Sequence, residues 1–330
     1  MTTVPNLAMT IGDPSGIGPE LAMKLCADEE NRAKANIKLL ASATEVEKYC
    51  AELSLSFPYS EEAKPGEVQI VGSELQDQPV KRGEHSVEGG RRVKSDLLKA
   101  IGMYKEGKAD AIIFLPLNKA ALHEAGMHEE DELRWFAKEL NYDGFTSELN
   151  FIPGLTTSRV TSHCGISQVA ARINARAVRD AINLLNDVIK GIGVEEPRIA
   201  VCALNPHGGE SGQFGREEID HIAPGVELAQ FDGVNVQGPF PPDTTFMRAQ
   251  KGNFDGVVTM YHDQGQIALK TIGFDKGVTV QGGLPVPLAT PAHGTAYEIV
   301  GQGIASIGPS QRAFDIATSL GIKTAEAAQA

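Results

Sequence analysis

Three histidines share a sequence context in which they could bind a metal ion. His163, His207 and His262 each follow an apolar run that is typical of a strand, and each lies in a loop that bears glycine or cysteine. In α/β proteins ligands bind at the carboxyl ends of strands. Imidazole suits zinc, copper, iron and nickel. Three imidazoles delivered to strand ends would therefore form an open metal site with a coordination position left for a substrate.

The spacing of these histidines favours a common site over three unrelated surface residues. A single histidine in a loop is more often a solvated residue than a ligand. Gaps of 44 (207 − 163) and 55 (262 − 207) place each one after a separate predicted strand. Four other histidines stand in polar or helical contexts that predict solvated side chains: His85, His123, His128 and His221. The eighth, His293, belongs to a different motif.

The elements that must position these residues alternate between strands and helices. Apolar runs predict strands at Leu7–Ile11, Ile37–Ala41, Val68–Val71, Ala111–Leu115, Leu149–Ile152, Arg159–Thr161, Arg198–Leu204, Val234–Gln237 and Val257–Met260. Helical spacing predicts helices from Pro19 and at Val87–Gly107, Lys119–Ala125, Glu129–Leu140, Ser167–Ile189 and Glu217–Ala229. Such alternation predicts an α/β protein whose mostly parallel sheets carry helices on both faces, with Trp135 and Phe136 in the core.

Length and charge limit the classes of partner. A chain of 330 residues can bury a large core and usually forms two domains. The net charge of −13 argues against nucleic acid and anionic membrane, since both require a basic surface. No run of about 18 apolar residues is present, and the four cysteines are scattered, which is typical of reduced thiols. We therefore expect a cytoplasmic protein that acts on a small molecule.

Two glycine-bearing motifs could hold a nucleotide. Gly12–Glu20 lies between a predicted strand and a predicted helix, and its glycines at 12, 16 and 18 differ from the Rossmann spacing. His293–Ala305 resembles the adenosine-binding loop of the isopropylmalate and isocitrate dehydrogenases. In that superfamily the position of Glu298 selects the cofactor, and a carboxylate there favours NAD over NADP. The resemblance implies a cofactor-binding set of His293, Gly294, Thr295, Ala296, Glu298, Gly12 and Asp13.

Several motifs in one order resemble the 4-hydroxythreonine-4-phosphate dehydrogenase (PdxA) family over nearly the whole chain. They are Gly12–Glu20, Pro116–Lys119, Asn205–Gly209, Gly215–Glu218, Gly238–Thr244, Tyr261–Gly265 and His293–Gly303. The resemblance implies one divalent metal on His163, His207 and His262, in a homodimer whose metal site draws on both subunits. Zinc is the first expectation for this ion, with nickel, cobalt, magnesium, manganese and iron left open.

The same resemblance implies NAD-dependent oxidation of a β-hydroxy acid that then loses CO₂. A metal would hold the hydroxyl and carboxylate oxygens of the substrate and lower the pKa of the hydroxyl. It would also stabilise the enolate that forms on decarboxylation. Asp243, Asp263 and Lys119 are alternative candidates for the group that accepts the proton.

The predicted substrate pocket departs from the family pattern. Lys270 matches the lysine that binds phosphate, but Thr279 replaces an asparagine and Leu288 replaces an arginine. Loss of the arginine removes a bidentate phosphate contact. Glu132 stands where the family carries substrate-binding His and Thr residues. We therefore expect a less charged substrate than 4-phosphohydroxythreonine, such as the cis-dihydrodiol of terephthalate, while a phosphorylated sugar acid stays open.

The resemblance also implies the domain organisation. Residues 1–125 and 285–330 would form one α/β/α domain that carries the adenosine loop, and residues 126–284 a second that carries the metal, the substrate and the dimer contact. The two would flank a cleft, as in isocitrate dehydrogenase. Two alternatives come from other functional classes: a metal-dependent lyase without redox chemistry, and a non-catalytic binding protein on this scaffold. Both predict that the adenosine-binding motif would be lost, but the motif at His293–Ala305 is complete.

Overall fold

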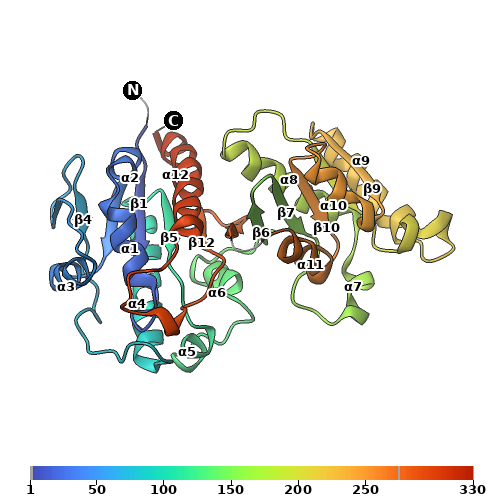
Figure 1. Cartoon of the computed structure of the whole chain (residues 1–330). Helices are drawn as coiled ribbons and strands as arrows, with labels where there is room; N and C mark the ends of the chain where they lie inside the picture. Colours follow the sequence, from blue (N-terminus) through green and yellow to red (C-terminus); the bar gives the residue numbers. More distant parts are fainter. Residues whose placement is uncertain (1–2, 274–275, 330) are drawn as a thin grey trace. The chain divides into compact units, whose positions relative to one another are not determined.

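The chain folds into two compact α/β units (Figure 1). The computed structural model describes residues 3–273 and 276–329. The first unit contains the described residues up to Tyr142 and those from Leu284 onward, and the second contains Asp143–Gly283. The chain therefore leaves the first unit once, after Tyr142, and returns to it at Leu284. The sequence predicts these divisions near residues 126 and 284.

The first unit is built on a sheet in which every described strand pair is parallel. Its strand order is β3-β4-β2-β1-β5-β12. The strands are β1 (Asn6–Thr10), β2 (Asn36–Leu40), β3 (Tyr59–Ser60), β4 (Val68–Ile70), β5 (Ala111–Phe114) and β12 (Leu288–Pro291). All four residues of β5 are buried, as expected of a parallel strand covered on both faces. The predicted fold class, α/β with mostly parallel sheets, is confirmed.

Five helices of the first unit begin at polar caps, whereas the first helix follows Ile17 without a side-chain cap. The helical segments of this unit are α1 (Gly18–Ala27), α2 (Glu29–Lys34), α3 (Ala43–Leu53), α4 (Val87–Lys105), α5 (Lys119–Glu124), α6 (Glu132–Glu139), η4 (Tyr297–Ile299) and α12 (Gly308–Gln329). Ser42 caps α3 in a capping box with Glu45, and Asn118 caps α5 by accepting from the backbone N–H of Ala121. Trp135 and Phe136 are buried in the core, as predicted.

The second unit combines parallel and antiparallel strands in the order β11-β6-β7-β10-β8-β9. The strands are β6 (Ser147–Ile152), β7 (Leu155–Arg159), β8 (Ile199–Cys202), β9 (Val236–Phe240), β10 (Gly256–Thr259) and β11 (Val278–Gly282). The run from β7 to β9 is parallel, whereas β6 pairs antiparallel with both β7 and β11. Its helical segments are α7 (Ile166–Arg172), α8 (Ala175–Gly191), η1 (Pro206–Gly212), η2 (Glu218–Ile222), α9 (Ala223–Phe231), α10 (Pro242–Gln250) and α11 (His262–Gly273).

Two predicted elements of the second unit differ from the structure. The single helix expected at Ser167–Ile189 is wrong, because the chain breaks into α7 and α8. Asn174 takes an extended backbone there, with φ −147° and ψ 161°, and its side chain accepts from the N–H of Ala177 to start α8. The strand expected at Arg159–Thr161 lies earlier in the chain than predicted. The observed strand, β7, is a threonine-rich run that ends at Arg159 and forms a hairpin with β6.

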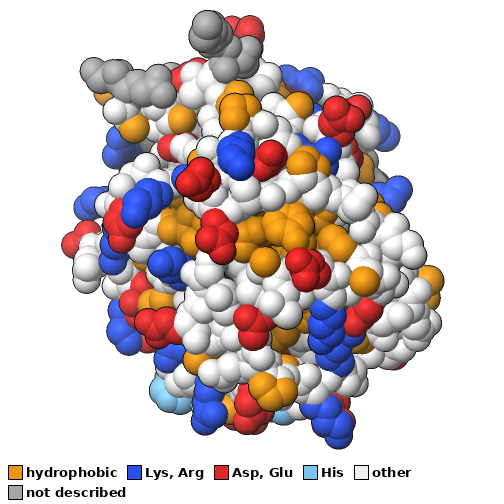
Figure 2. Space-filling model, turned by 90° about the vertical axis from the view of Figure 1, so that its left-hand side faces the viewer, with side chains coloured by type: hydrophobic (Ala, Val, Ile, Leu, Met, Phe, Trp, Pro, Cys, Tyr) orange, Lys and Arg blue, Asp and Glu red, His pale blue; other side chains and the backbone are white. Residues whose placement is uncertain are grey.

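The surface mixes charges of both signs with apolar side chains. On the face drawn in Figure 2, hydrophobic side chains form a band across the middle, with acidic and basic side chains around it. Within the described residues, no helix has both the length and the apolar character that crossing a membrane requires.

A buried ion-pair network joins α3, α4 and the end of β2. The guanidinium of Arg92 donates to Asp96 Oδ2 at 2.8 Å, to Glu45 Oε1 at 2.7 Å and to the carbonyl of Leu40 at 3.3 Å. Asp96 has no exposed surface. Burial raises the pKa of Asp96 to about 6, although the charge of Arg92 opposes that change.

Replacing Asp96 is expected to change how stability depends on pH. The folded-state pKa lies above the unfolded value, so the stability that Asp96 contributes is fully present below pH 4 and is lost as pH rises through 6. The difference in unfolding free energy between the natural chain and the Asp96→Asn variant should therefore decrease by about 2 kcal/mol from pH 4 to pH 7. Urea unfolding of both proteins across this range measures the difference, and parallel pH profiles would contradict the assignment.

Candidate functional site

The glycine turn after β1 lies against the segment that follows β5. A Cβ added to Gly12 would lie 2.5 Å from the carbonyl oxygen of Pro116, and one added to Gly18 would lie 2.2 Å from that of Ile11. Gly12 also has a φ of +69°. Only glycine fits such close backbone approaches. The turn therefore lies at the carboxyl ends of two neighbouring parallel strands, where α/β sheets bind ligands.

The two predicted nucleotide motifs meet in the first unit. The Tyr297 hydroxyl donates to Asp13 Oδ2 at 2.8 Å, and the backbone N–H of Ile17 donates to the carbonyl of Thr295 at 3.0 Å. Gly16 is needed at this contact, since a Cβ there would lie 2.8 Å from Thr295. Segments about 280 residues apart in the sequence thus form one continuous surface.

Buried polar groups fix the geometry of this surface. Asp13 has no exposed area, and burial raises its pKa, although hydrogen bonds from the Ser15 backbone and from Tyr297 lower it. Burial together with this bond to Asp13 raises the pKa of Tyr297 to about 12. Lys24 closes the other end of the loop by donating to Glu20 at 2.7 Å and to the carbonyl of Ala305 at 2.9 Å.

His293 offers an unused hydrogen-bonding atom on the same loop. Its Nε2 is buried and has no partner among the described residues, while its Nδ1 lies 3.4 Å from the carbonyl of Gly294. Burial lowers the pKa of His293, so the ring is held neutral. An unpaired buried ring nitrogen costs free energy unless a ligand satisfies it. Ala296 nearby has a φ of +43°, and the Glu298 side chain is exposed.

Lys119 and Glu132 form an ion pair in the first unit. Lys119 Nζ lies 3.1 Å from Glu132 Oε2, and the lysine side chain is 73% exposed while that of Glu132 is 8% exposed. The structure therefore brings a candidate proton acceptor and a candidate substrate-binding residue together. The buried carboxylate of Glu132 is thus paired with the exposed side chain of Lys119.

Leu288 lies in the core of the first unit. It is fully buried in β12, within an apolar cluster that includes Ile112, Trp135 and Phe136. The structure therefore gives Leu288 a packing role in place of the predicted contact with substrate. An apolar side chain without exposed surface packs against its neighbours and cannot set the polarity of a pocket.

Two of the three predicted metal ligands meet in the second unit. His163 follows β7 and His262 begins α11 directly after β10, and these two strands pair in parallel with Thr259 opposite Arg159. The centroids of the two imidazole rings are 5.6 Å apart. Two imidazoles on one tetrahedral zinc would have centroids roughly 5 Å apart, given Zn–N distances of about 2.0–2.1 Å. The pair therefore fits a shared ion.

Asp263 orients one of these rings. Its Oδ1 lies 2.7 Å from Nδ1 of His262. A carboxylate on one ring nitrogen fixes the tautomer and leaves the other nitrogen free for a metal, an arrangement that metal-binding histidines commonly have. Asp263 was a candidate proton acceptor, and this geometry favours an orienting role instead.

His207 lies apart from the pair. It opens a left-handed stretch that runs through Ser211, with φ values of 54° at His207 and 57° at Ser211. Glu218 anchors the base of this stretch by accepting from the backbone N–H groups of Leu204 and Asn205, each at 2.8 Å. Within residues 3–273 and 276–329, no group of three His, Cys, Asp or Glu side chains is placed to hold a metal ion.

The remaining candidates lie on neighbouring elements of the second unit. Lys270 lies on α11, two turns after His262, and Asp243 is exposed in the first turn of α10. Thr279 on β11 accepts a hydrogen bond from the Asn150 side chain at 3.1 Å. Sequence reasoning missed Asn150 and its neighbour Arg159, although alternating polar residues in an otherwise apolar strand could have indicated them.

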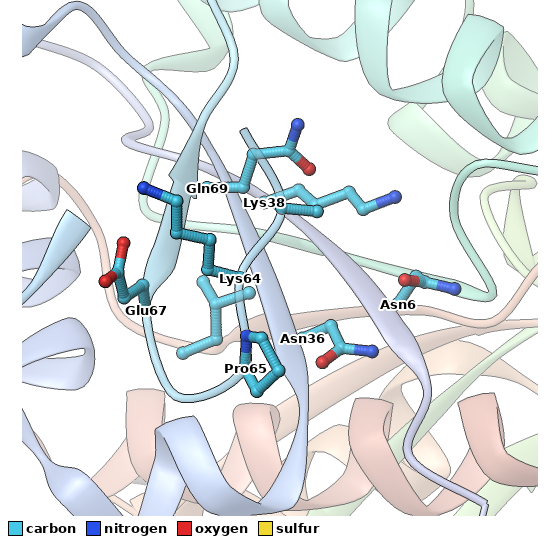
Figure 3. A pocket seen from close by; sticks show the side chains of 9 residues that line it. Asn6, Asn36, Lys38, Lys64, Pro65, Glu67 and Gln69 are labelled. Atoms are coloured by element: carbon cyan, nitrogen blue, oxygen red, sulfur yellow. The ribbon is translucent and has the colours of Figure 1, made fainter. Parts of the chain in front are cut away.

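A cavity of 210 Å³ lies away from all these motifs, beside the amino ends of β1, β2 and β4. Figure 3 shows that the ammonium groups of Lys38 and Lys64 point away from each other in this view. Lys38 already donates to the carbonyl of Lys108 at 2.6 Å. The two cations therefore do not converge on a common ligand, and this cavity is not part of the candidate site.

Comparison with known proteins gives one family. The model of the family described as "Pyridoxal phosphate biosynthetic protein PdxA" matches residues 21–317. A Pseudomonas aeruginosa protein, provisionally named as a second 4-hydroxythreonine-4-phosphate dehydrogenase, is 46% identical over 97% of this chain and 98% of its own. The D-threonate 4-phosphate dehydrogenase of Pectobacterium atrosepticum is 35% identical over 94% of this chain and 97% of its own.

Solved structures agree with this match. The 4-hydroxythreonine-4-phosphate dehydrogenase of Klebsiella pneumoniae superposes with a TM-score of 0.80 at 31% identity, over 97% of this chain and 99% of its own. The terephthalate 1,2-cis-dihydrodiol dehydrogenase of Burkholderia xenovorans has a TM-score of 0.72 at 27% identity, over 96% of this chain and 98% of its own.

Proposed function

Because this chain belongs to the PdxA family, we propose that it uses NAD and a divalent metal to oxidise a phosphorylated β-hydroxy acid. Its dehydrogenase relatives make it an oxidoreductase that acts on a CH–OH group. The proposed substrate class is a four-carbon acid with a 4-phosphate, as in the names of the relatives. The observation that carries the proposal is the contact between the two nucleotide motifs at Asp13 and Tyr297.

The joined loops of the first unit support an NAD site. Nε2 of His293 is a buried nitrogen without a partner in the described part of the chain, and an adenine amino group could donate a hydrogen bond to it. Glu298 is exposed on the same loop and can accept hydrogen bonds from ribose hydroxyls. NAD would supply the hydride acceptor. The hydroxyl proton must then pass to a side chain, for which Asp243 and Lys119 remain the candidates.

The imidazole pair of the second unit supports a metal site. His163 and His262 would hold the ion, and Asp263 would keep the His262 ring in position. A divalent metal would supply Lewis acidity for the oxidation of the alcohol and for the loss of CO₂ from the β-keto acid. Lys270 and Thr279 would bind the phosphate end of the substrate through a charge and a hydroxyl.

We propose that a second copy of the chain completes this metal site with its His207. The segment between β8 and α9, which carries His207, projects from the body of the second unit (Figure 1, yellow). It exposes Phe214 and Ile219, whose side chains are 51% and 45% accessible. Apolar side chains on a projecting segment are typical of a protein–protein contact. A homodimer would bury them and bring the third imidazole to the pair.

A second candidate substrate is a carboxylated ring diol. The family's phosphate-binding arginine is absent here, because Leu288 occupies its position and lies in the core. The dihydrodiol dehydrogenase of Burkholderia xenovorans acts, by its name, on the cis-dihydrodiol of terephthalate, which is a β-hydroxy acid without phosphate. The match of Lys270 to the family's phosphate-binding lysine favours the phosphorylated acid over this alternative.

Removal of either paired histidine should abolish turnover. Loss of the metal removes several kcal/mol of transition-state stabilisation, so His262→Ala and His163→Ala should lower kcat/KM by on the order of 10³-fold or more. Steady-state NADH formation measures the effect, and circular dichroism checks the fold. His128→Ala is the matched control, since His128 is exposed in the first unit, where its ring packs edge-on against His123. Full activity of either paired-histidine variant would refute the metal site.

Glu298 should set the cofactor preference. Its carboxylate repels a 2′-phosphate, so the natural chain should use NAD far better than NADP. Glu298→Gln should raise kcat/KM for NADP by roughly tenfold, which corresponds to about 1.4 kcal/mol of removed repulsion. The exposed Glu61→Gln serves as a control for the change in net charge. An unchanged NADP/NAD ratio in Glu298→Gln would show that this loop does not contact the ribose.

A further inference from the structure

The sheet of the second unit has a face that changes from apolar to polar along its strands. Ile152, Leu155 and Val257 at one end belong to an apolar cluster with Leu269 of α11. Toward the carboxyl ends of β7 and β10 the same face becomes polar. By strand register and alternation it carries Glu148, Asn150, Thr157, Arg159, Thr259, Thr279 and Gln281.

Arg159 is the charged centre of this polar face. Its side chain is only 4% exposed and forms a close ion pair with Glu148. A buried ion pair costs desolvation free energy that an apolar pair of similar volume would not. The ion pair between Arg159 and Glu148 therefore contributes little to the stability of the fold. The role of Arg159 is indicated by the other groups to which it donates hydrogen bonds.

Hydrogen bonds connect Arg159 to the segment that carries His163. Its Nε donates to the hydroxyl of Ser162 at 3.0 Å, and Ser162 directly precedes His163. The same loop is tied to β10 at Thr161, whose hydroxyl and backbone N–H both donate to the carbonyl of Met260, at 2.7 Å and 3.1 Å. The position of the His163 backbone therefore depends on the guanidinium.

A second branch connects Arg159 to the helix that carries His262. Its Nη1 lies 3.4 Å from Asn150 Oδ1, which also accepts from Gln266 Nε2 at 2.7 Å. Gln266 lies one turn after His262 on α11. Asn150 uses its Nδ2 to donate to the Thr279 hydroxyl at 3.1 Å. One planar guanidinium thus reaches both histidine segments and a candidate substrate-binding residue.

We infer that Arg159 is a positioning residue that sets the distance between the His163 and His262 rings through Ser162 on one side and Asn150 and Gln266 on the other. This inference rests on the proposed metal site. It extends that site to four side chains that do not touch the ion: Arg159, Ser162, Asn150 and Gln266. Outer groups that orient metal ligands typically change metal affinity by roughly 10- to 100-fold when they are removed.

The test is cobalt(II) titration of the full-length Arg159→Lys variant, followed by visible absorption. Lysine keeps the charge beside Glu148 but lacks the fork that reaches Ser162 and Asn150 together. We expect Co²⁺ to bind roughly 10- to 100-fold more weakly, with a changed d–d spectrum. Gln266→Met removes the second branch at a partly exposed position and should weaken binding in the same direction.

Arg198→Lys is the matched control. Arg198 forms an ion pair with Asp255 at 2.9 Å in the same unit, so this variant should bind Co²⁺ as the natural chain does. Equal Co²⁺ affinity and an unchanged spectrum in both Arg159→Lys and Gln266→Met would overturn the positioning role alone. If the natural chain itself bound no Co²⁺, the proposed metal site would fall, and this inference with it.

Discussion

The contact between the turn at Gly12–Glu20 and the loop at His293–Ala305 is the constraint on which the rest of the molecule depends. The hydrogen bond from Tyr297 to the buried Asp13 requires the last part of the chain to return to the first sheet. That return is made by β12, which pairs with β5, and by α12, which packs on both strands. The second unit is consequently an insertion between two halves of the first, and it carries the imidazole pair.

Much of this arrangement could be predicted from local chemistry. The glycines between a predicted strand and a predicted helix indicated the turn at Gly12. The structure gives the reason for them, since only glycine tolerates the close approach of Pro116 to Gly12. The histidines were recognisable because each follows an apolar run, and the parallel pairing of β7 with β10 brings two of them together. The separation of His207 from this pair could not be predicted in the same way, since the left-handed backbone from His207 to Ser211 has no counterpart in hydrophobic periodicity.

Other features depend on tertiary packing that no local pattern specifies. From the sequence, Leu288 is interpreted as replacing an arginine of the substrate pocket. In the structure, its strand pairs with β5, and its side chain is buried in the core. The sequence predicts Arg159 at the start of a strand, yet the register of β6, β7 and β11 surrounds it with Glu148 and Asn150. The break at Asn174 follows from a cap that competes with helix continuation. Leu288 and Arg159 thus take their neighbours from other strands, whereas the break at Asn174 is set by a hydrogen bond from Ala177, three residues further on.

The central claim is that this frame oxidises a phosphorylated β-hydroxy acid with NAD. The most direct measurement is NADH formation by the metal-loaded protein, with D-threonate 4-phosphate, 4-phosphohydroxythreonine and the cis-dihydrodiol of terephthalate compared under one set of conditions. The account predicts that one of the two phosphorylated acids gives a kcat/KM at least about tenfold above that of the diol, a difference of about 1.4 kcal/mol. Turnover of the diol alone, or of none of the three, would contradict it.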